Sequence, residues 1–522
     1  PIEDSGVERI VLLVQSAGDL TAGAGPGQDH GPAVPRILTA IGWAVGAALS
    51  IALIIEVRSG SAVSVVLGGW PADLGIVLSF DVISATFAPL LLLLELAVIL
   101  YVRKEERRPL FYALLQFLFG AVFALLLAQD LFNEYVILEL LTLVSFLLVG
   151  YERRPVQVWS SLKYLVLASI GMSLFLVGLA IVYRHTGTLN LRLLRDVLSS
   201  PGDIEWLPLA STLLVAGVAV KAGVFVFSQW LPSAHSTAPP AVSALLSGLV
   251  IKMGIVVLFR LSQSFPLAMT LQVLGSATAL LGVLYAAYAV NLKRMLAFHT
   301  LSQIGYLVLG LAVGTPAALA GTLDYAIAHG LFKGLLFLAA GEAALVAGSD
   351  RFADLVAQRR SLPSTTTAAL LIGTLGIVGL PPLAGFGAKA VLFDAHPNLY
   401  VVVVFALTSV GTAFSFAKLL PVLRFSRGMP RRSTKTTAYA VLVLPILLFI
   451  PWTQFTFPSL PLGGHLRPLL VLESAAAILL GGLLYQLLKN RRPSLPKSVF
   501  FLEEATVGLT LGLLLVYALL KL

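Results

Sequence analysis

The stretch "AHGLFKGLLFLAAG" (Ala328–Gly341) indicates the fold class, because it combines a membrane-like composition with two ionisable side chains. Apart from His329 and Lys333, its residues are apolar or small, as in a helix surrounded by hydrocarbon. A spacing of four residues places the two side chains on one helix face. Histidine exchanges protons near neutral pH and burial makes the ionisation of a lysine adjustable, so the pair suits a proton relay. The structural alternative is a histidine that only bonds to a backbone carbonyl of a neighbouring helix.

The whole chain shares this apolar composition. Of its 522 residues, 58% are hydrophobic and 12% are charged, about half the charged fraction of a soluble protein (~25%). Apolar runs of about twenty residues recur and predict an all-α, polytopic membrane protein with about 14–15 transmembrane helices. The chain has no cysteine, which excludes a cysteine-ligated iron–sulfur cluster, a disulfide and thiol catalysis on this chain.

The apolar runs predict fifteen spans joined by short polar loops. We expect them at about residues 37–57, 83–101, 109–129, 131–150, 162–183, 207–228, 241–259, 267–290, 298–314, 321–346, 365–394, 399–420, 438–451, 469–488 and 499–520.

The basic residues lie mainly in these loops. When loops are assigned alternately to two sides, one side holds about three Lys/Arg for each one on the other, and the rich side is expected in the cytoplasm. The net charge of +9 is therefore interpreted as a topology signal and not as a nucleic-acid surface. The expected location is integral and multi-pass, in a bacterial plasma membrane or an energy-converting internal membrane, with the Lys/Arg-rich loops cytoplasmic.

Several ionisable residues fall inside the spans. A lysine at a helix centre costs about 2.5–3.5 kcal/mol on insertion scales, so Lys221, Lys252 and Lys333 are functional candidates. Glu139 lies eight residues into an apolar helix and needs a cationic partner to stay charged, for which Lys221 is a candidate. Four secondary candidates are weaker. Asp130 lies near a turn, where it can cap a helix, and Lys163 lies near a helix end, from which it can snorkel. The other two are the histidines His235 and His299.

Two proline-rich segments predict broken helices. "QWLPSAHSTAPP" (229–240) contains Pro232, Pro239 and Pro240, and "GIVGLPPLAGFGAKA" (376–390) contains Pro381 and Pro382 shortly before Lys389. Proline frees backbone groups, which a membrane tolerates only against protein or a wet cavity. Interrupted helices in two halves of a transporter indicate the transport route.

These residues also carry a family resemblance. The string "VKAGVFVFSQWLPSAHSTAPPAVSALLSGLVIKMG" (220–254) resembles the antiporter-like subunits shared by complex I and Mrp-type cation/proton antiporters. So do "NLKRMLAFHTLSQIGY" (291–306), "HGLFKGLLFLAAG" (329–341) and "GLPPLAGFGAKA" (379–390), in the same order. The segment "GGWPADLGIVLSFD" (68–81) is most similar to the D-type Mrp subunits.

The resemblance implies two inverted five-helix repeats, each with a broken helix and a half-channel. It assigns proton-relay roles to six residues: Glu139, Lys221, Lys252, His329, Lys333 and Lys389. The implied domains are a polar N-terminal segment that could be fragmentary (1–35), N-terminal helices (36–108), a first repeat (109–260), a second repeat (267–425) and C-terminal helices (437–522).

The chain departs from the family pattern at three positions. Val226 and Ser228 stand where the family commonly has proline and histidine, and Asn291 replaces an acid. Because Ser228 replaces the family's histidine, the relay step of that histidine has no counterpart at this position. The chain closes with an ordinary span in place of the long lateral helix of the largest family members.

We therefore expect a proton-translocating, D-like subunit of a multisubunit Mrp-type Na⁺(cation)/H⁺ antiporter. The alternative is a proton-pumping subunit of an NAD(P)H:quinone oxidoreductase or membrane-bound hydrogenase. A redox enzyme in its own right is disfavoured by the lack of a dinucleotide loop, cysteine cluster or haem pattern, and a passive scaffold is a third alternative. We expect no cofactor, metal or catalytic residue on this chain, and as partners the lipid bilayer, other membrane subunits, protons and Na⁺, without nucleic acid.

Overall fold

The computed structural model describes residues 33–59, 62–69, 75–105, 108–199, 204–394, 398–423, 433–448, 468–489 and 502–521. The predicted polar segment 1–35 therefore lies outside the described residues except for its last three.

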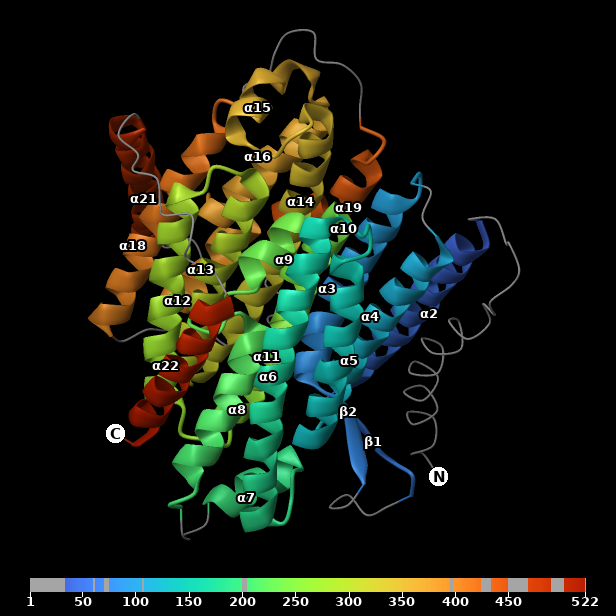
Figure 1. Cartoon of the computed structure of the whole chain (residues 1–522), viewed down its shortest axis with the longest axis vertical. Helices are drawn as coiled ribbons and strands as arrows, with labels where there is room; N and C mark the ends of the chain where they lie inside the picture. Colours follow the sequence, from blue (N-terminus) through green and yellow to red (C-terminus); the bar gives the residue numbers. More distant parts are fainter. Residues whose placement is uncertain are drawn as a thin grey trace.

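Helix α2 and the hairpin after it stand at one edge of the molecule (Figure 1). Helix α2 (Ala33–Arg58) leads into an antiparallel hairpin of β1 (Val63–Leu67) and β2 (Ile76–Phe80), in which Val63 faces Phe80. Helix α3 (Val82–Val102) follows, and the Asp81 side chain accepts from the Ser84 backbone N–H at its start. The hairpin is the only sheet among the described residues.

The next helices form the first predicted repeat. It contains α4 (Pro109–Leu127), α5 (Leu131–Val149), α6 (Pro155–Thr186), the short α7 (Leu191–Ser199), α8 (Leu207–Ala222), α9 (Leu231–Thr237), α10 (Pro240–Leu245), the π-helical turn η1 (Leu246–Val250) and α11 (Ile251–Ser262).

The second predicted repeat has the same order of parts. It contains α12 (Ala268–Tyr288), α13 (Leu292–Val313), α14 (Pro316–Ala347), the short α15 (Phe352–Ala357) and η2 (Arg359–Ser361), α16 (Ser364–Val378), α17 (Ala384–Asp394), α18 (Leu399–Phe416) and η3 (Ala417–Leu419). In each half two helices precede one of 32 residues, α6 or α14, and a broken helix follows. Because each half has five membrane crossings, an odd number, the second half enters from the opposite face.

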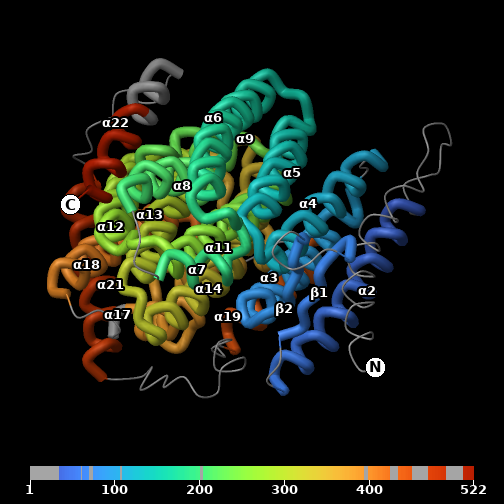
Figure 2. Tube along the Cα trace, turned by 90° about the horizontal axis from the view of Figure 1, so that it is seen from below, coloured from blue at the N-terminus to red at the C-terminus, as the bar shows by residue number. Residues whose placement is uncertain are grey.

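Three further helices close the chain: α19 (Thr436–Leu447), α21 (Pro468–Leu488) and α22 (Leu502–Lys521). Helices α18, α21 and α22 stand at the edge opposite α2 (Figure 2). Helix α14 packs against α10 of the first half, against α13, α16 and α17 of its own half, and against α3 and α19. It is therefore the central helix that joins both halves to the flanks.

The helix count confirms the predicted fold class. Eleven helices of the described residues are long and apolar enough to span a membrane, and four shorter apolar helices accompany them. Two of the short ones, α8 and α16, are the first halves of the interrupted helices.

Helices α12 and α13 pack backbone against backbone. A Cβ atom added at Gly275 or Gly282 of α12 would meet backbone atoms of α13, and one added at Gly305 of α13 would meet the backbone of α12. Small residues allow this close approach in membranes, where association depends on van der Waals packing.

One expected loop residue is buried. The Lys293–Arg294 pair was expected in a cytoplasmic loop, but α13 already begins at Leu292 and Lys293 is only 6% exposed. Its Nζ donates to the Ala238 carbonyl at 2.6 Å. This carbonyl lies at the turn between α9 and α10, and it accepts from Lys293 and, at 3.2 Å, from the Ser243 hydroxyl of α10.

Candidate functional site

Both predicted helix breaks are present, and each exposes backbone carbonyls to side chains. Helix α8 ends at Gly223 (φ +69°) and α16 at Gly379 (φ +87°), a left-handed conformation that glycine adopts without strain. The Val220 carbonyl accepts from Trp230 Nε1 at 2.8 Å, and the Ile377 carbonyl accepts from Lys389 Nζ at 2.9 Å. The breaks thus place polar backbone inside the bundle, where protein shields it from lipid.

The first break carries an ion pair. Lys221 Nζ lies 3.9 Å from Glu139 Oε1 and also donates to the Thr142 hydroxyl, one helical turn further along α5. The lysine side chain is 5% exposed and that of the glutamate 26%. The partner predicted for Glu139 is therefore the one found.

Lys252 stands where the two halves meet. It is fully buried just after η1 and donates from Nζ to the Ser247 carbonyl. A π-helical turn leaves such carbonyls available, and turns of this kind are frequent at functional sites. A Cβ at Gly248 would meet the Gly330 carbonyl, so η1 approaches α14 directly beside His329.

The His329–Lys333 pair occupies the middle of α14. His329 and Lys333 are both fully buried, and Lys333 Nζ donates to the Leu296 carbonyl of α13. Neither ring nitrogen of His329 has a hydrogen-bond partner within the described residues. The structural alternative, a histidine bonded to a neighbouring backbone carbonyl, is therefore not what these residues form.

Two tyrosines connect His329 to Lys389. The Tyr325 ring stacks against His329 with 6.5 Å between ring centres, and its hydroxyl donates to Gln303 Oε1. Lys389 Nζ lies 6.0 Å from the Tyr325 ring centre and 5.5 Å from that of Tyr306. Sequence reasoning missed Tyr306, Tyr325 and Gln303, because such residues are common in apolar helices. Their only sequence signal is a position near the predicted relay residues.

Two of the four secondary candidates, Asp130 and Lys163, have partners close to them in the sequence. Asp130 caps α5 by accepting from the Phe132 and Asn133 backbone N–H groups at 2.9 and 3.0 Å, and burial raises the pKa of its carboxyl. Lys163 is half-buried with Nζ 5.2 Å from the centre of the Trp159 ring.

The two secondary histidines are fully buried. His235 lies between the proline positions of the first break, with its ring centre 5.8 Å from that of Phe337 on α14. The His299 ring centre is 4.8 Å from that of Phe416 on α18. Both histidine rings thus contact aromatic side chains of neighbouring helices.

A second buried ion pair was not predicted. Arg260 of α11 donates to Glu134 of α5 at 2.7 Å, and the two side chains are 4% and 0% exposed. Arg260 also donates to the Leu125 and Leu126 carbonyls at 3.0 and 2.8 Å, which satisfies the end of α4.

The family described as "NADH:quinone oxidoreductase/Mrp antiporter, TM" matches residues 128–415, which include both broken helices and every relay candidate. The chain belongs to this family. The family prediction from the sequence motifs is thereby confirmed.

Curated relatives come from both branches of the family. The chain is 31% identical to the N-type NADH-quinone oxidoreductase subunit of Desulforudis audaxviator, over 77% of this chain and 83% of that protein. It is 30% identical to the D-type Na(+)/H(+) antiporter subunit of Bacillus subtilis, over 68% of this chain and 74% of that protein.

Two solved membrane complexes contain a chain of the same fold. One is the archaeal membrane-bound sulfane sulfur reductase, with TM-score 0.76, 23% identity and coverage of 92% of this chain and 98% of that chain. The other is the Mrp complex from Dietzia, with TM-score 0.70, 24% identity and coverage of 93% and 99%. These two likenesses show the fold, and the names of the curated relatives as subunits agree with the predicted membrane partner subunits.

Proposed function

We propose that this family member is the D-like, proton-translocating subunit of a multisubunit Mrp-type Na⁺/H⁺ antiporter. The observation that carries the proposal is the line of buried ionisable side chains from the Glu139–Lys221 pair to Lys389, which crosses both broken helices. Such groups are costly in a membrane and mark proton pathways. The similarity to the D-type antiporter subunit of Bacillus subtilis supports the assignment.

The Glu139–Lys221 pair acts as the switch. Forming or breaking an ion pair changes how tightly its lysine holds a proton, and two coupled groups titrate together. At 3.9 Å the pair is close enough to interact yet longer than a direct hydrogen bond, and Thr142 gives Lys221 a second partner. Small side-chain rotations therefore exchange one partner for the other.

The proton then moves along the centre. Lys252, His329 and Lys333 lie on η1/α11 and α14, which meet backbone to backbone at Gly248 and Gly330. Histidine accepts on one ring nitrogen and donates from the other, so His329 links neighbouring groups. Lys389 is the terminal group, reached past the Tyr325 ring.

The proposed orientation places the Lys/Arg-rich loops in the cytoplasm of a bacterial or energy-converting membrane. Sodium crosses through a partner subunit, since cation pathways use carboxylates or backbone carbonyls and this line is rich in lysine and histidine. The relay needs no cofactor or metal on this chain.

Sodium-triggered dissipation of a pH gradient tests the proposal. Everted vesicles from antiporter-deficient cells would contain the chain with its neighbouring subunits, as wild type, Glu139→Ala and Lys221→Ala. We expect sodium-dependent dissipation in the wild type and loss in both variants, with subunit assembly unchanged on native gels. A fully assembled wild type without a sodium response would refute the antiporter assignment. Unchanged transport by both variants would instead favour a scaffold.

The second candidate is a proton-pumping subunit of a redox complex. It is favoured by the 31% identity to the N-type NADH-quinone oxidoreductase subunit. The two candidates share the relay and differ in the proteins that co-purify with the chain: hydrophobic antiporter subunits for the first, hydrophilic redox subunits for the second.

A further inference from the structure

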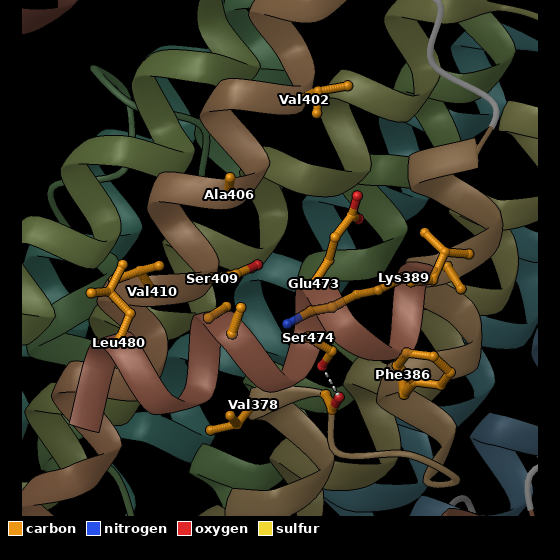
Figure 3. A pocket seen from close by; sticks show the side chains of 15 residues that line it. Val378, Phe386, Lys389, Val402, Ala406, Ser409, Val410, Glu473, Ser474 and Leu480 are labelled. Atoms are coloured by element: carbon orange, nitrogen blue, oxygen red, sulfur yellow. Dashed lines mark hydrogen bonds between the residues drawn. The ribbon is translucent and has the colours of Figure 1, made fainter. Parts of the chain in front are cut away.

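A cavity of about 340 Å³ lies beside Lys389, between α18, α21 and the break that separates α16 from α17 (Figure 3). This is far more than the roughly 10–15 Å³ that a single water needs. Most of its wall is apolar, and its ionisable and hydroxyl side chains are Lys389, Ser409, Glu473 and Ser474.

Lys389 is the buried ionisable group of this cavity. Its side chain lines the wall although the residue is only 7% exposed. An ammonium group has three donors, and one of them reaches the Ile377 carbonyl at 2.9 Å. The remaining donors are available to water in the cavity, so the last group of the proposed relay can be hydrated.

Glu473 lines the same cavity from the opposite helix. In Figure 3 the Lys389 side chain extends from α17 with its nitrogen near Ser409 and Ser474, and the Glu473 carboxylate extends from α21 toward the Val402 and Ala406 side of the cavity. Glu473 is the one Asp, Glu, Lys or Arg residue of the apolar helix α21, and a carboxylate inside a membrane span is costly enough to be a functional candidate.

Both groups lie near the same face of the membrane. Glu473 comes five residues after the start of α21 at Pro468, and Lys389 comes five residues before the end of α17 at Asp394. At 1.5 Å per residue each lies roughly 8 Å from its helix end. In the proposed topology both ends face away from the cytoplasm.

Helix α21 is attached to the break itself. Ser474 donates from Oγ to the Gly379 carbonyl at 2.6 Å, a carbonyl at the end of α16 (Figure 3). The neighbouring Glu473 is thereby held at a set position relative to Lys389.

We propose that the cavity is a water-filled exit and that Glu473 carries the proton from Lys389 to the non-cytoplasmic water. The ammonium of Lys389 gives one proton through cavity water to the Glu473 carboxylate, which leaves a neutral amine and a carboxylic acid. The acid releases the proton to bulk water and becomes a carboxylate again, and the amine is reprotonated from the His329 side. This inference rests on the proposed relay and orientation.

Chemical rescue tests the role of Glu473. The chain has no cysteine, so Glu473→Cys introduces the only thiol on it. The purified complex is treated with iodoacetate, which adds a carboxylate, or with iodoacetamide, which adds a neutral amide of similar size, and is then reconstituted for proton-flux measurements. Treated wild type corrects for cysteines of partner subunits.

Three further variants complete the set: Glu473→Gln, Glu473→Asp and Lys389→Ala. The matched control is Asp196→Asn of α7, which changes an exposed carboxylate outside the cavity.

We expect Glu473→Gln and untreated Glu473→Cys to lower the proton flux at least tenfold, Glu473→Asp to keep part of it, and Asp196→Asn to match wild type. Iodoacetate should restore the flux of Glu473→Cys, and iodoacetamide should not.

Wild-type flux in Glu473→Gln, or equal rescue by both reagents, would overturn the exit role. If Lys389→Ala abolishes flux while Glu473→Gln does not, the relay stands and only the exit role fails. A wild type without proton flux would refute the proposed function itself.

Discussion

Lys221 illustrates how a single buried cation is stabilised by partners of different kinds. On α5 it meets a carboxylate, Glu139, and one turn away a hydroxyl, Thr142. Lys252, Lys333 and Lys389 instead donate to backbone carbonyls that a π turn, a neighbouring helix or a helix break makes available. Of these four lysines, Lys221 is the one with a carboxylate within ion-pair distance in the described part of the chain, which is why the switch is assigned to that position.

At this scale we predict that the hydroxyl of Tyr325 contributes to transport separately from its ring. Tyr325→Phe keeps the ring beside His329 and Lys389 but removes the donor to Gln303. A net hydrogen bond is worth about 1 kcal/mol, which corresponds to roughly fivefold in rate. Sodium-driven proton flux should fall by about this factor, whereas Tyr183→Phe on the exposed face of α6 should not change it. Equal rates for the two variants would contradict the prediction.

The sequence indicated the ionisable members of the site but not their neutral partners. A lysine in an apolar run is costly, so Lys221, Lys252 and Lys333 stand out in a single sequence, and the proline-rich segment before Lys389 singles out the fourth. Thr142 and the tyrosines cost little in a helix and have no comparable signal. The Glu134–Arg260 pair has no sequence signal for another reason, because the two residues lie 126 residues apart and only the fold brings them together.

At the scale of elements, the break between α16 and α17 should be required for transport. Proline lacks a backbone N–H, so Pro381 and Pro382 keep the two segments from forming one helix. The double variant Pro381→Ala/Pro382→Ala should let the helix continue and draw the Ile377 carbonyl away from Lys389. We expect at least a tenfold loss of flux and slower hydrogen exchange in residues 376–384.

The matched control for this prediction is Pro89→Ala. Pro89 lies inside α3, which continues through it without a break. Transport should therefore be retained. A double variant at 381 and 382 that transports as well as Pro89→Ala would show that the break is dispensable.

The Arg260–Glu134 pair should stabilise the packing of α11 against α4 and α5. Removing one partner of a buried pair costs about 3–5 kcal/mol, whereas replacing both by apolar residues costs much less. Glu134→Leu should therefore lower the midpoint of thermal unfolding in detergent, and Glu134→Leu/Arg260→Met should recover part of it. Recovery stays incomplete because the Leu125 and Leu126 carbonyls lose their donor.

An exposed pair provides the control. Arg154 and Glu152 lie 3.3 Å apart, and the arginine side chain is 73% exposed. Exposed pairs contribute about 0–1 kcal/mol, so Arg154→Met should shift the midpoint little. If Glu134→Leu shifts it no more than Arg154→Met does, the buried pair is not a stabilising one.

The ends of elements could be predicted from the sequence where Pro and Gly mark them, as at Pro381, Pro382 and Gly379. The start of α13 could not be predicted in this way. A Lys-Arg pair next to an apolar run is typical of a cytoplasmic loop, but Lys293 is drawn inward by the Ala238 carbonyl. That carbonyl belongs to another helix pair, so no local pattern could indicate it.

At the scale of the whole molecule, the fifteen predicted spans correspond to the eleven long and four short apolar helices of the described residues. Hydropathy suffices for this, because a membrane-spanning segment must satisfy its backbone internally and a full crossing by one helix takes about twenty apolar residues. The packing of α14 against both halves was not predictable, since its apolar surface carries no directional signal.

The proposed orientation gives a prediction for the entire chain. Lys104, after α3, and Ser199, at the end of α7, are exposed and should lie on opposite sides of the membrane. Because the chain lacks cysteine, Lys104→Cys and Ser199→Cys each add a single thiol. A membrane-impermeant maleimide should label Lys104→Cys only in everted vesicles and Ser199→Cys only in right-side-out ones. The reverse pattern would invert the assignment of sides.

The glycine-lined contact between α12 and α13 has a consequence for how the protein works over time. Two helices that approach this closely at their glycines resist sliding and rolling against each other, so we expect α12 and α13 to move as one body. The Leu296 carbonyl and Gln303 on α13 are then fixed reference points for the lysine and tyrosine that contact them. At these two contacts we therefore expect the transport cycle to proceed by rotation of the Lys333 and Tyr325 side chains and not by movement of α13 against α12.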